Sequence, residues 1–251
     1  MKTIIMKNDQ NGMTHKPVEN EQQSDIISRA VENRLAEVQS KIKMAADQRP
    51  PRYGTEPVKL VAVSKRQPVV KIDAALRAGQ RVFGENRVQE ASQRWRNRRE
   101  EHNDLILHLI GPLQTNKVAE AVALFDVIEI VDRKKLARAL AKEMIRQKRY
   151  LPCYIQVNTG EEPQKSGILP AQLDEFFNFC RNELALPIIG LMCIPPVDEE
   201  VAMHFALLNR MAQRLNLPNL SMGMSGDYIE AIGFGATSVR VGSAIFSMRD
   251  N

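Results

Sequence analysis

Short apolar runs alternate with helical patterns along most of the chain. Eight runs have the length of a β-strand, and we expect strands at 58–64, 81–83, 105–110, 126–131, 152–158, 187–193, 219–223 and 238–242. Because most of these runs carry apolar residues at consecutive positions, both faces of each strand should be buried. This pattern is typical of a parallel sheet that is covered by helices.

Helical patterns fill the segments between these runs. The predicted helices cover 68–79, 86–99, 115–122, 133–149, 170–184, 198–215 and 225–234. Pro68 and Pro170 each lie at a first helical turn, and Ser225 is the predicted N-cap of the last helix. Eight strands that alternate with helices predict an α/β protein with a single closed (β/α)8 TIM barrel. A doubly wound open sheet is the alternative, but the first strand lacks the G-x-G-x-x-G turn typical of that fold.

The amino-terminal segment has a different pattern. Residues 1–23 are rich in Asn, Gln, Lys and Glu and poor in large apolar residues, which favours a flexible tail. A helical pattern begins at Asp25 and is broken by the stretch QRPPRYGTEP. We therefore expect a tail over 1–23 and one domain over 24–251, in which an N-terminal helix precedes the barrel.

Composition changes this picture little. Of the 251 residues, 43% are hydrophobic and 26% are charged, which is ordinary for a globular protein with a sizeable core. Much of the formal net charge of +5 lies in 94–100 and 132–149, where the apolar residues have helical spacing. We interpret both segments as solvated helix faces. With 5% aromatic residues and no nucleic-acid motif, we expect no binding of RNA or DNA.

The cysteines and histidines exclude some classes of site. Cys153, Cys180 and Cys193 are far apart, and the four histidines lack metal-ligand spacing. We therefore expect neither a disulfide framework nor a metal site. The start of the chain has only a three-residue apolar run, and no stretch is long and apolar enough to span a membrane. A reduced, cytoplasmic location is the expectation.

The first predicted strand ends in a lysine. In the stretch KLVAVSKRQP, the apolar run from Leu60 to Val63 is followed by Ser64 and Lys65. Reactive residues of (β/α)8 barrels come from the carboxyl ends of the strands. Lys65 is either a solvated charge that ends the strand or a pocket lysine that forms a Schiff base with a carbonyl compound. It is better placed than the competing lysines, which are Lys71 in a helix and Lys117 and Lys165 in loops.

The end of the last predicted strand suggests a phosphate site. Gly242 and Ser243 follow that strand and open a short apolar helix, whose free amides are able to bind phosphate. Barrels often form phosphate sites from the loops after strands seven and eight. Ser221, near the end of the seventh strand, is a candidate to add a hydroxyl. The alternative is an ordinary strand–turn–helix in which Gly242 is only a turn residue.

Arg240 lies in the last strand between Val239 and Val241. If both valines pack outward against helices, side-chain alternation directs Arg240 to the barrel axis. A buried arginine requires an anion, a ring nitrogen or a carboxylate, and Glu129 on another strand is the internal alternative. The lysine, the phosphate site and an inward arginine together fit pyridoxal 5′-phosphate. This cofactor needs an amine for its aldehyde, amides for its phosphate and a partner for its pyridine nitrogen.

A set of motifs, in order along the chain, resembles the pyridoxal phosphate homeostasis proteins. The motifs are AVSKRQP, FGENRVQE, HLIGPLQTNK, KSG, GLMCIP, LSMGMSGD and VRVGSAIF. The match runs from about residue 30 to the end of the chain. The family consists of single-domain relatives of the barrel half of alanine racemase, and is thought to buffer and deliver the cofactor.

The resemblance implies a (β/α)8 barrel that carries pyridoxal 5′-phosphate on Lys65. It also implies that Arg240 faces the pyridine nitrogen and that Asn86 lies beside the ring. The implied phosphate residues are Ser221, Gly242 and Ser243. The chain departs from the family pattern at Arg87, where an aromatic residue is expected, and at Gly226, where a polar one is expected. These departures concern the surface near the pocket mouth and the cap of the following helix.

Two classes of function remain, a carrier without catalytic residues and a racemase-like enzyme. The permanent charge of Arg240 would keep the pyridine nitrogen unprotonated and weaken the ring as an electron sink. A racemase also needs a base on each face of its substrate. In alanine racemase the second base is a tyrosine from an extra domain and the neighbouring subunit. No such domain is predicted here, and none of the four tyrosines is clearly at a strand end.

We therefore expect a non-catalytic carrier of pyridoxal 5′-phosphate that takes part in the homeostasis of this cofactor. The expected partners are the cofactor and apo-enzymes that depend on it, and the expected oligomeric state is a monomer. The racemase-like enzyme stays open as the alternative.

Overall fold

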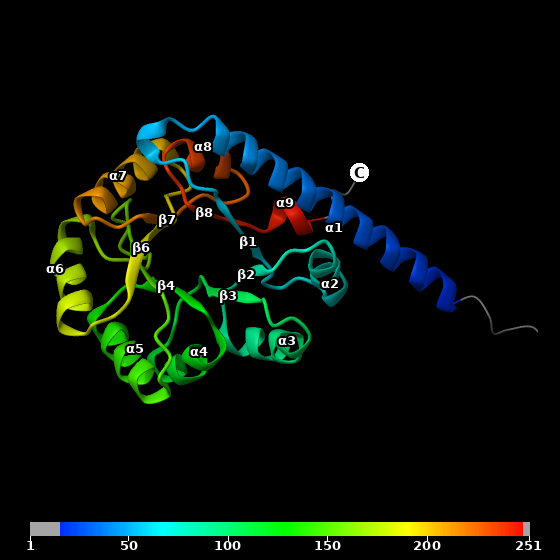
Figure 1. The fold of residues 1–251 in the computed structure, drawn as a ribbon, viewed down its shortest axis with the longest axis horizontal. Helices are drawn as coiled ribbons and strands as arrows, with labels where there is room; N and C mark the ends of the chain where they lie inside the picture. Colours follow the sequence, from blue (N-terminus) through cyan, green and yellow to red (C-terminus); the bar gives the residue numbers. More distant parts are fainter. Residues whose placement is uncertain (1–15, 248–251) are drawn as a thin grey trace, which may run out of the picture.

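The strands form a closed parallel barrel. The computed structural model describes residues 16–247, and neighbouring strands pair in the order β1 to β8, with β8 pairing back to β1 (Figure 1). The strands are β1 Lys59–Val63, β2 Val82–Glu85, β3 Ile106–Leu109, β4 Val127–Val131, β5 Cys153–Val157, β6 Ile188–Cys193, β7 Asn219–Ser221 and β8 Ser238–Val241. Each lies within two residues of its predicted range at both ends. The predicted (β/α)8 barrel is therefore confirmed.

Helices cover the outside of the barrel between successive strands (Figure 1). They are α1 Lys16–Asp47, α2 Val69–Arg77, α3 Val88–Glu101, α4 Val118–Leu124, α5 Lys134–Gln147, α6 Leu173–Asn178, α7 Val201–Arg214, α8 Tyr228–Gly233 and α9 Ser243–Phe246. Short single-turn segments are η1 Pro51–Tyr53, η2 Thr115–Lys117, η3 Pro170–Gln172 and η4 Phe179–Glu183. One face of each of α2, α5 and α7 is buried and carries apolar side chains such as Ile72, Leu140 and Leu208, as the helical spacing predicts.

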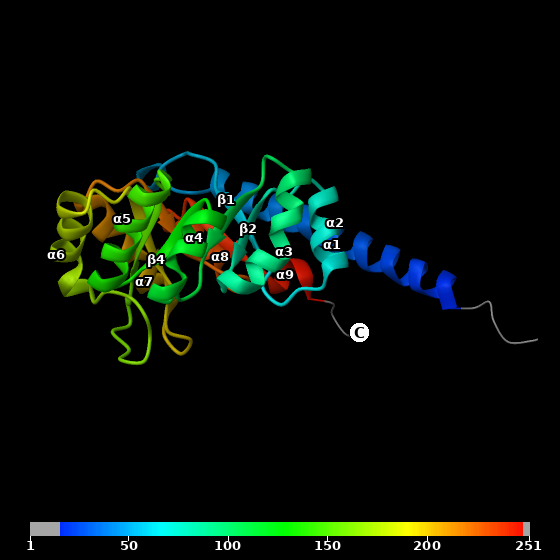
Figure 2. The same ribbon diagram turned by 90° about the horizontal axis from the view of Figure 1, so that it is seen from below.

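Helix α1 is an addition to the eight repeating units. It contacts α2, α8 and α9, and its amino-terminal part extends beyond the barrel (Figures 1 and 2). The helix begins at Lys16, which corrects the prediction of a flexible tail over 1–23, because eight of those residues are helical. Residues 1–15 of that predicted tail lie outside the described residues. None of the helices in the described part of the chain is long and apolar enough to cross a membrane.

A buried arginine fixes the segment between α1 and β1. Arg49 donates hydrogen bonds to the backbone oxygens of Gly54 at 2.8 Å, Glu56 at 2.6 Å and Ala236 at 3.1 Å. Ala236 lies just before β8, so these bonds join the start of the barrel to its last unit. Hydrogen bonds from a charged donor are stronger than those between neutral groups, which offsets the cost of burying the guanidinium.

Candidate functional site

A cavity of about 480 Å³ lies at the carboxyl ends of the strands. The described lining comes from residues at or just after six of the strands, and it holds two cations and no carboxylate. The lining residues are Val63, Lys65, Gln67, Asn86, Ile110, Ile194, Met224, Ser225, Gly226, Arg240, Gly242, Ser243 and Ser247. The cavity therefore brings together five of the six predicted site residues, and Ser221 is the exception.

Lys65 sits in a turn held by hydrogen bonds on its two sides. The backbone amide of Ser64 bonds Gly84 O at 3.1 Å, and that of Gln67 bonds Ser64 O at 3.1 Å. The hydroxyl of Ser64 donates to the buried carboxylate of Glu85 at 2.7 Å. Arg66 adopts a left-handed conformation with φ of 58°, which turns the chain directly after Lys65. The lysine is thus placed on the cavity wall by a fixed backbone.

The competing lysines are engaged elsewhere. Lys71 donates to Phe246 O, Lys117 pairs with Glu120, and Lys165 pairs with Glu162. Within residues 16–247, the amine of Lys65 has no described hydrogen bond or ion pair. A lysine amine that lines a cavity without an internal partner is available to a ligand.

Asn86 follows β2 and approaches the loop after β3 very closely. A Cβ atom added at Gly111 would lie 2.6 Å from Asn86 O and 2.7 Å from Asn86 Cα. Only glycine fits at such a distance, so Gly111 permits the backbone of Asn86 to lie at the cavity. The motif HLIGPLQTNK therefore contributes to the site through Gly111, which leaves space for the backbone of Asn86.

The turn after β8 is open toward the cavity and packs tightly on β1. A Cβ atom at Gly242 would lie 3.2 Å from both Val63 Cβ and Val63 O. The backbone amides of Gly242 and Ala244 donate to the hydroxyl of Ser225 at 3.2 and 3.3 Å. These amides and this hydroxyl form a polar cradle of the kind that accepts phosphate.

The structure corrects the predicted helix cap and places Ser221 outside the cavity lining. Helix α8 begins at Tyr228 with Asp227 as its N-cap, so Ser225 does not cap it. Ser225 instead lines the cavity, a position that the sequence pattern did not reveal. Ser221, the predicted phosphate residue, is fully buried and is absent from the lining, because its hydroxyl is held inside the barrel. Among the described serines, Ser225 is therefore the better candidate for a phosphate ligand.

Arg240 points into the barrel, as the alternation of β8 predicted. Its Nη1 donates to the Ser221 hydroxyl at 2.6 Å, and its Nη2 donates to Cys193 O at 2.8 Å. Its Nη1 also lies 3.9 Å from Oε2 of Glu129. Glu129 belongs to β4, on the far side of the barrel from β8, so this pair spans the interior. The internal carboxylate that the sequence left as an alternative is thus a partner of Arg240, although Arg240 also lines the cavity.

The carboxylate of Glu129 accepts three kinds of stabilisation. Burial alone would raise its pKa, but the hydrogen bond from His108, the charge of Arg240 and the hydroxyl of Ser221 together lower its pKa below the ordinary value. The distances are 2.5 Å to His108 Nδ1 and 2.6 Å to Ser221 Oγ. Glu129 is therefore ionised, and its negative charge faces the positive charge of Arg240.

The cysteines do not take part in the chemistry of this cavity. All three are free and buried, and burial raises the pKa of the Cys180 and Cys193 thiols to about 12. Thiols with such pKa values are inert near neutral pH. Across residues 16–247, no group of three or more His, Cys, Asp or Glu side chains is arranged to hold a metal ion.

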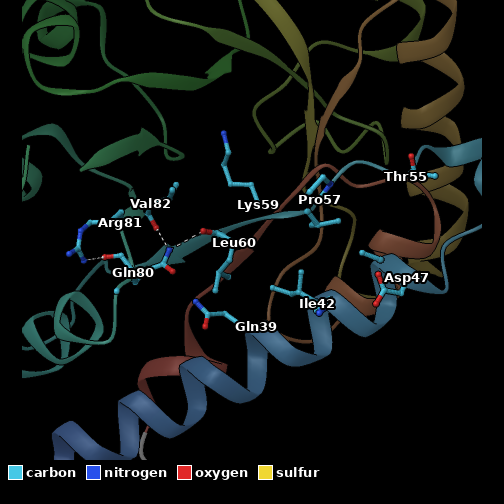
Figure 3. Close-up of a pocket in the computed structure, with 14 residues that line it drawn as sticks. Gln39, Ile42, Asp47, Thr55, Pro57, Lys59, Leu60, Gln80, Arg81 and Val82 are labelled. Atoms are coloured by element: carbon cyan, nitrogen blue, oxygen red, sulfur yellow. Dashed lines mark hydrogen bonds between the residues drawn. The ribbon is translucent and has the colours of Figure 1, made fainter. Parts of the chain in front are cut away.

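A second cavity, of about 620 Å³, lies at the opposite end of the barrel strands (Figure 3). It lies beside α1 at the starts of β1 and β2, where Gln80 donates to Leu60 O at 3.0 Å and to Val82 O at 2.6 Å. Lys59 extends away from α1 in this view. Residues at this end of such barrels serve stability, whereas those at the carboxyl ends serve chemistry. We therefore place the functional site at the cavity of Lys65.

Comparison with known proteins shows the family of this chain. The family model described as alanine racemase, N-terminal domain, matches residues 26–250. A pyridoxal phosphate homeostasis protein of Pasteurella multocida is 38% identical over 88% of this chain and 98% of its own length. One from Vibrio cholerae is 42% identical over 77% of this chain and 86% of its own length. The chain belongs to the pyridoxal phosphate homeostasis protein family.

Solved structures extend the agreement to three dimensions. This homeostasis-family chain matches PipY of Synechococcus elongatus, with 36% identity and a TM-score of 0.73 to the form with PLP bound. The alignment covers 86% of this chain and all of PipY. Alanine racemase from E. faecalis is 15% identical with a TM-score of 0.61, over 90% of this chain and 59% of that one. The second likeness shows the fold alone.

Replacing Glu129 by Gln should reduce the pH dependence of stability in acid. Because its folded pKa is lowered, ionised Glu129 contributes stability that is fully present above its unfolded pKa of about 4.5 and is lost as pH falls through the folded value. The gap in unfolding free energy between the wild type and Glu129→Gln should therefore narrow between pH 7 and about pH 3.

Urea unfolding at both pH values measures this gap. Glu101→Gln, which changes an exposed carboxylate, serves as the control and should leave the pH dependence close to that of the wild type. An equal gap for Glu129→Gln at the two pH values would show that Glu129 is not preferentially ionised in the folded protein.

Proposed function

We propose that this protein binds pyridoxal 5′-phosphate at the cavity of Lys65 and takes part in the homeostasis of that cofactor as a carrier. The observation that carries the proposal is one cavity in which three features meet: a lysine amine with no partner among the described residues, an inward arginine, and the turn at Gly242 with the hydroxyl of Ser225. The names of the curated relatives support the homeostasis role, and the PipY structure with PLP bound supports the choice of ligand.

The residues present fit this cofactor. A volume of about 480 Å³ lies within the range of roughly 300 to 1,000 Å³ that is common for small-molecule sites. The lining has two cations, Lys65 and Arg240, and no carboxylate, so its potential favours an anionic ligand. Any side chain at Gly242 would press against Val63, so the cradle at this turn depends on glycine.

Each wall of the cavity then has a role. Lys65 supplies the amine for the aldehyde, and Arg240 supplies N–H donors for the pyridine nitrogen. The phosphate is held by the amides at Gly242 and Ser243 with the hydroxyl of Ser225, and Asn86 flanks the ring. When bound, the cofactor supplies an aldehyde that reacts with amines and a ring that withdraws electrons from them.

The lining is better suited to holding the cofactor than to turnover. Arg240 is permanently charged and donates hydrogen bonds, so it gives the ring nitrogen no proton. Lys65 is the one described lining residue that exchanges protons readily, whereas racemisation requires a base on each face of the substrate. The four tyrosines lie elsewhere, at η1 (Tyr53), before β5 (Tyr150), within β5 (Tyr154) and at the start of α8 (Tyr228).

The proposal includes where and with whom the protein acts. We infer a monomer in a reducing, cytoplasmic compartment, which the three free and buried cysteines support. The recipients are apo-enzymes that depend on pyridoxal 5′-phosphate. Neither a nucleic acid nor a membrane is needed as a partner.

Lys65 should be the residue that carries the cofactor. Borohydride reduction of the loaded protein, followed by peptide mapping, should place the added pyridoxyl mass on the peptide that contains Lys65. Lys65→Ala should abolish the label, because Lys71, Lys117 and Lys165 are engaged in other contacts. The matched control is Lys117→Ala, which should label as the wild type does. A label that persists on another lysine in Lys65→Ala would contradict the assignment.

The phosphate should be bound by the cradle at β8 and not by Ser221. We expect Ser225→Ala to weaken binding of pyridoxal 5′-phosphate by about tenfold while changing the affinity for pyridoxal little, since one hydrogen bond to a charged group is lost. Gly242→Val should cost more affinity than Ser243→Ala, because the amides carry most of the binding. Fluorescence titration with each ligand measures the ratio of the affinity for pyridoxal 5′-phosphate to the affinity for pyridoxal. A larger loss of phosphate preference in Ser221→Ala than in Ser225→Ala would reverse the assignment.

The loaded protein should deliver its cofactor without turning over amino acids. Incubation with an apo-enzyme that depends on pyridoxal 5′-phosphate should restore the activity of that enzyme. L-Alanine in deuterated water should show only slow exchange at the α position, because the described cavity offers no second base. Rapid racemisation that Lys65→Ala abolishes would favour the enzyme over the carrier.

A further inference from the structure

One carboxylate and one guanidinium are buried together inside the barrel, directly beneath the cavity. Glu129, Ser221 and Arg240 are each at most 3% exposed, and the hydroxyl of Ser221 bridges the two charges. The hydroxyl accepts from Arg240 Nη1 at 2.6 Å and donates to Glu129 Oε2 at 2.6 Å. Glu129 does not line the cavity, so it reaches a ligand only through Arg240.

The charges of this cluster balance without a ligand. His108 contacts Oε1 of Glu129 through Nδ1 at 2.5 Å, and its Nε2 is buried with no hydrogen-bond partner in the described structure. A protonated imidazole would leave an unpaired N–H at Nε2, which is costly in a buried position, so we assign His108 as neutral with the proton on Nδ1. The cluster then contains one negative charge, on Glu129, and one positive charge, on Arg240.

Arg240 has donors left for the cavity. A guanidinium carries five N–H donors, and the described hydrogen bonds to Ser221 and Cys193 O use two of them. The side chain that faces the proposed cofactor is therefore already paired with an internal anion on its other side. Any ligand atom that accepts a hydrogen bond from Arg240 must share its positive charge with Glu129.

We propose that Glu129 is a positioning residue and built-in counter-charge that weakens cofactor binding through Arg240 and so makes the cofactor releasable. This inference rests on the proposed function and concerns the same site. Without Glu129, the empty protein would bury an unpaired cation, and an incoming cofactor whose ring nitrogen accepts from Arg240 would relieve part of that cost. With Glu129 in place, the empty protein is already neutral at this point, and the cofactor gains less electrostatic energy on binding.

An acid–arginine pair at the other end of the barrel offers a control. Asp126 lies just before β4, and its Oδ1 lies 3.6 Å from Arg149 Nη2. Neither Asp126 nor Arg149 lines the cavity of Lys65. A substitution at Asp126 therefore disturbs an acid–arginine pair without changing the partner of the proposed cofactor.

The test compares Glu129→Gln with the wild type in the full chain, with pyridoxal 5′-phosphate as the probe. Glu129→Gln should lower the melting temperature of the cofactor-free protein, increase the rise in melting temperature on adding cofactor, and bind it about tenfold more tightly with slower release. Glu129→Asp retains the charge and should bind within about threefold of the wild type. Asp126→Asn should lower the melting temperature equally with and without cofactor.

The sign of the affinity change separates this role from a purely structural one. A merely structural glutamate would give a variant that binds the cofactor as the wild type does or more weakly, and either result overturns the proposal. If Glu129→Gln does not fold alone, it is purified with pyridoxal 5′-phosphate and then dialysed. The variant should be folded while it is loaded with cofactor and should lose its circular dichroism signal after dialysis. A variant that is unfolded both with cofactor and after dialysis overturns the proposal.

The outcome for the wild type distinguishes the two proposals. A wild-type protein that does not bind pyridoxal 5′-phosphate overturns the proposed function and this inference together. A wild-type protein that binds it, with an unchanged affinity in Glu129→Gln, overturns only the role of Glu129.

Discussion

The pairing of β8 with β1 is the constraint on which the site depends. Val61 pairs with Arg240 and Ala62 with Val241, so the two strands lie in parallel and end at the same rim. Lys65 leaves one strand and Gly242 leaves the other, and the tight approach of Gly242 to Val63 leaves room for no side chain between them. Without this closure, the reactive amine and the amide cradle would lie at opposite edges of an open sheet. The same closure places Arg240 inside a barrel, where a charge must find a partner.

Much of this arrangement could be predicted because it follows from periodicity. The apolar runs gave each strand to within two residues, and alternation along β8 correctly directed Arg240 inward. The serines show where that reasoning ended. The predicted strand over 219–223 placed Ser221 near the rim of the barrel. Ser221 is indeed the last residue of β7, but its hydroxyl points to Glu129 inside the barrel and not to the cavity. Ser225 lies in the loop beyond, where the backbone has no fixed period, so its position follows from the tertiary packing of the β7 and β8 loops.

The partner of Arg240 marks another limit of the sequence. Glu129 was one of several groups able to neutralise the arginine, and a sequence does not say which side chains meet across a barrel. The structure adds His108 and the bridging hydroxyl of Ser221, and neither could be paired with Glu129 from spacing along the chain. The start of α1 was also missed, because polar residues at 16–23 gave no apolar stripe from which to extend the helix. The contacts that decide the partners of Glu129 are long-range.

The anchoring of α9 has a consequence for the order in which the protein folds. This helix has only four residues, and its last carbonyls are held by Arg34 from α1, which donates to Ser247 O, and by Lys71 from α2, which donates to Phe246 O. A single turn is not stable in isolation, so α9 forms when it docks on elements from the opposite end of the chain. Contacts of such large sequence separation close late and slowly. A chain emerging from the ribosome therefore has Lys65 long before it has the turn at Gly242 and the helix that follows it.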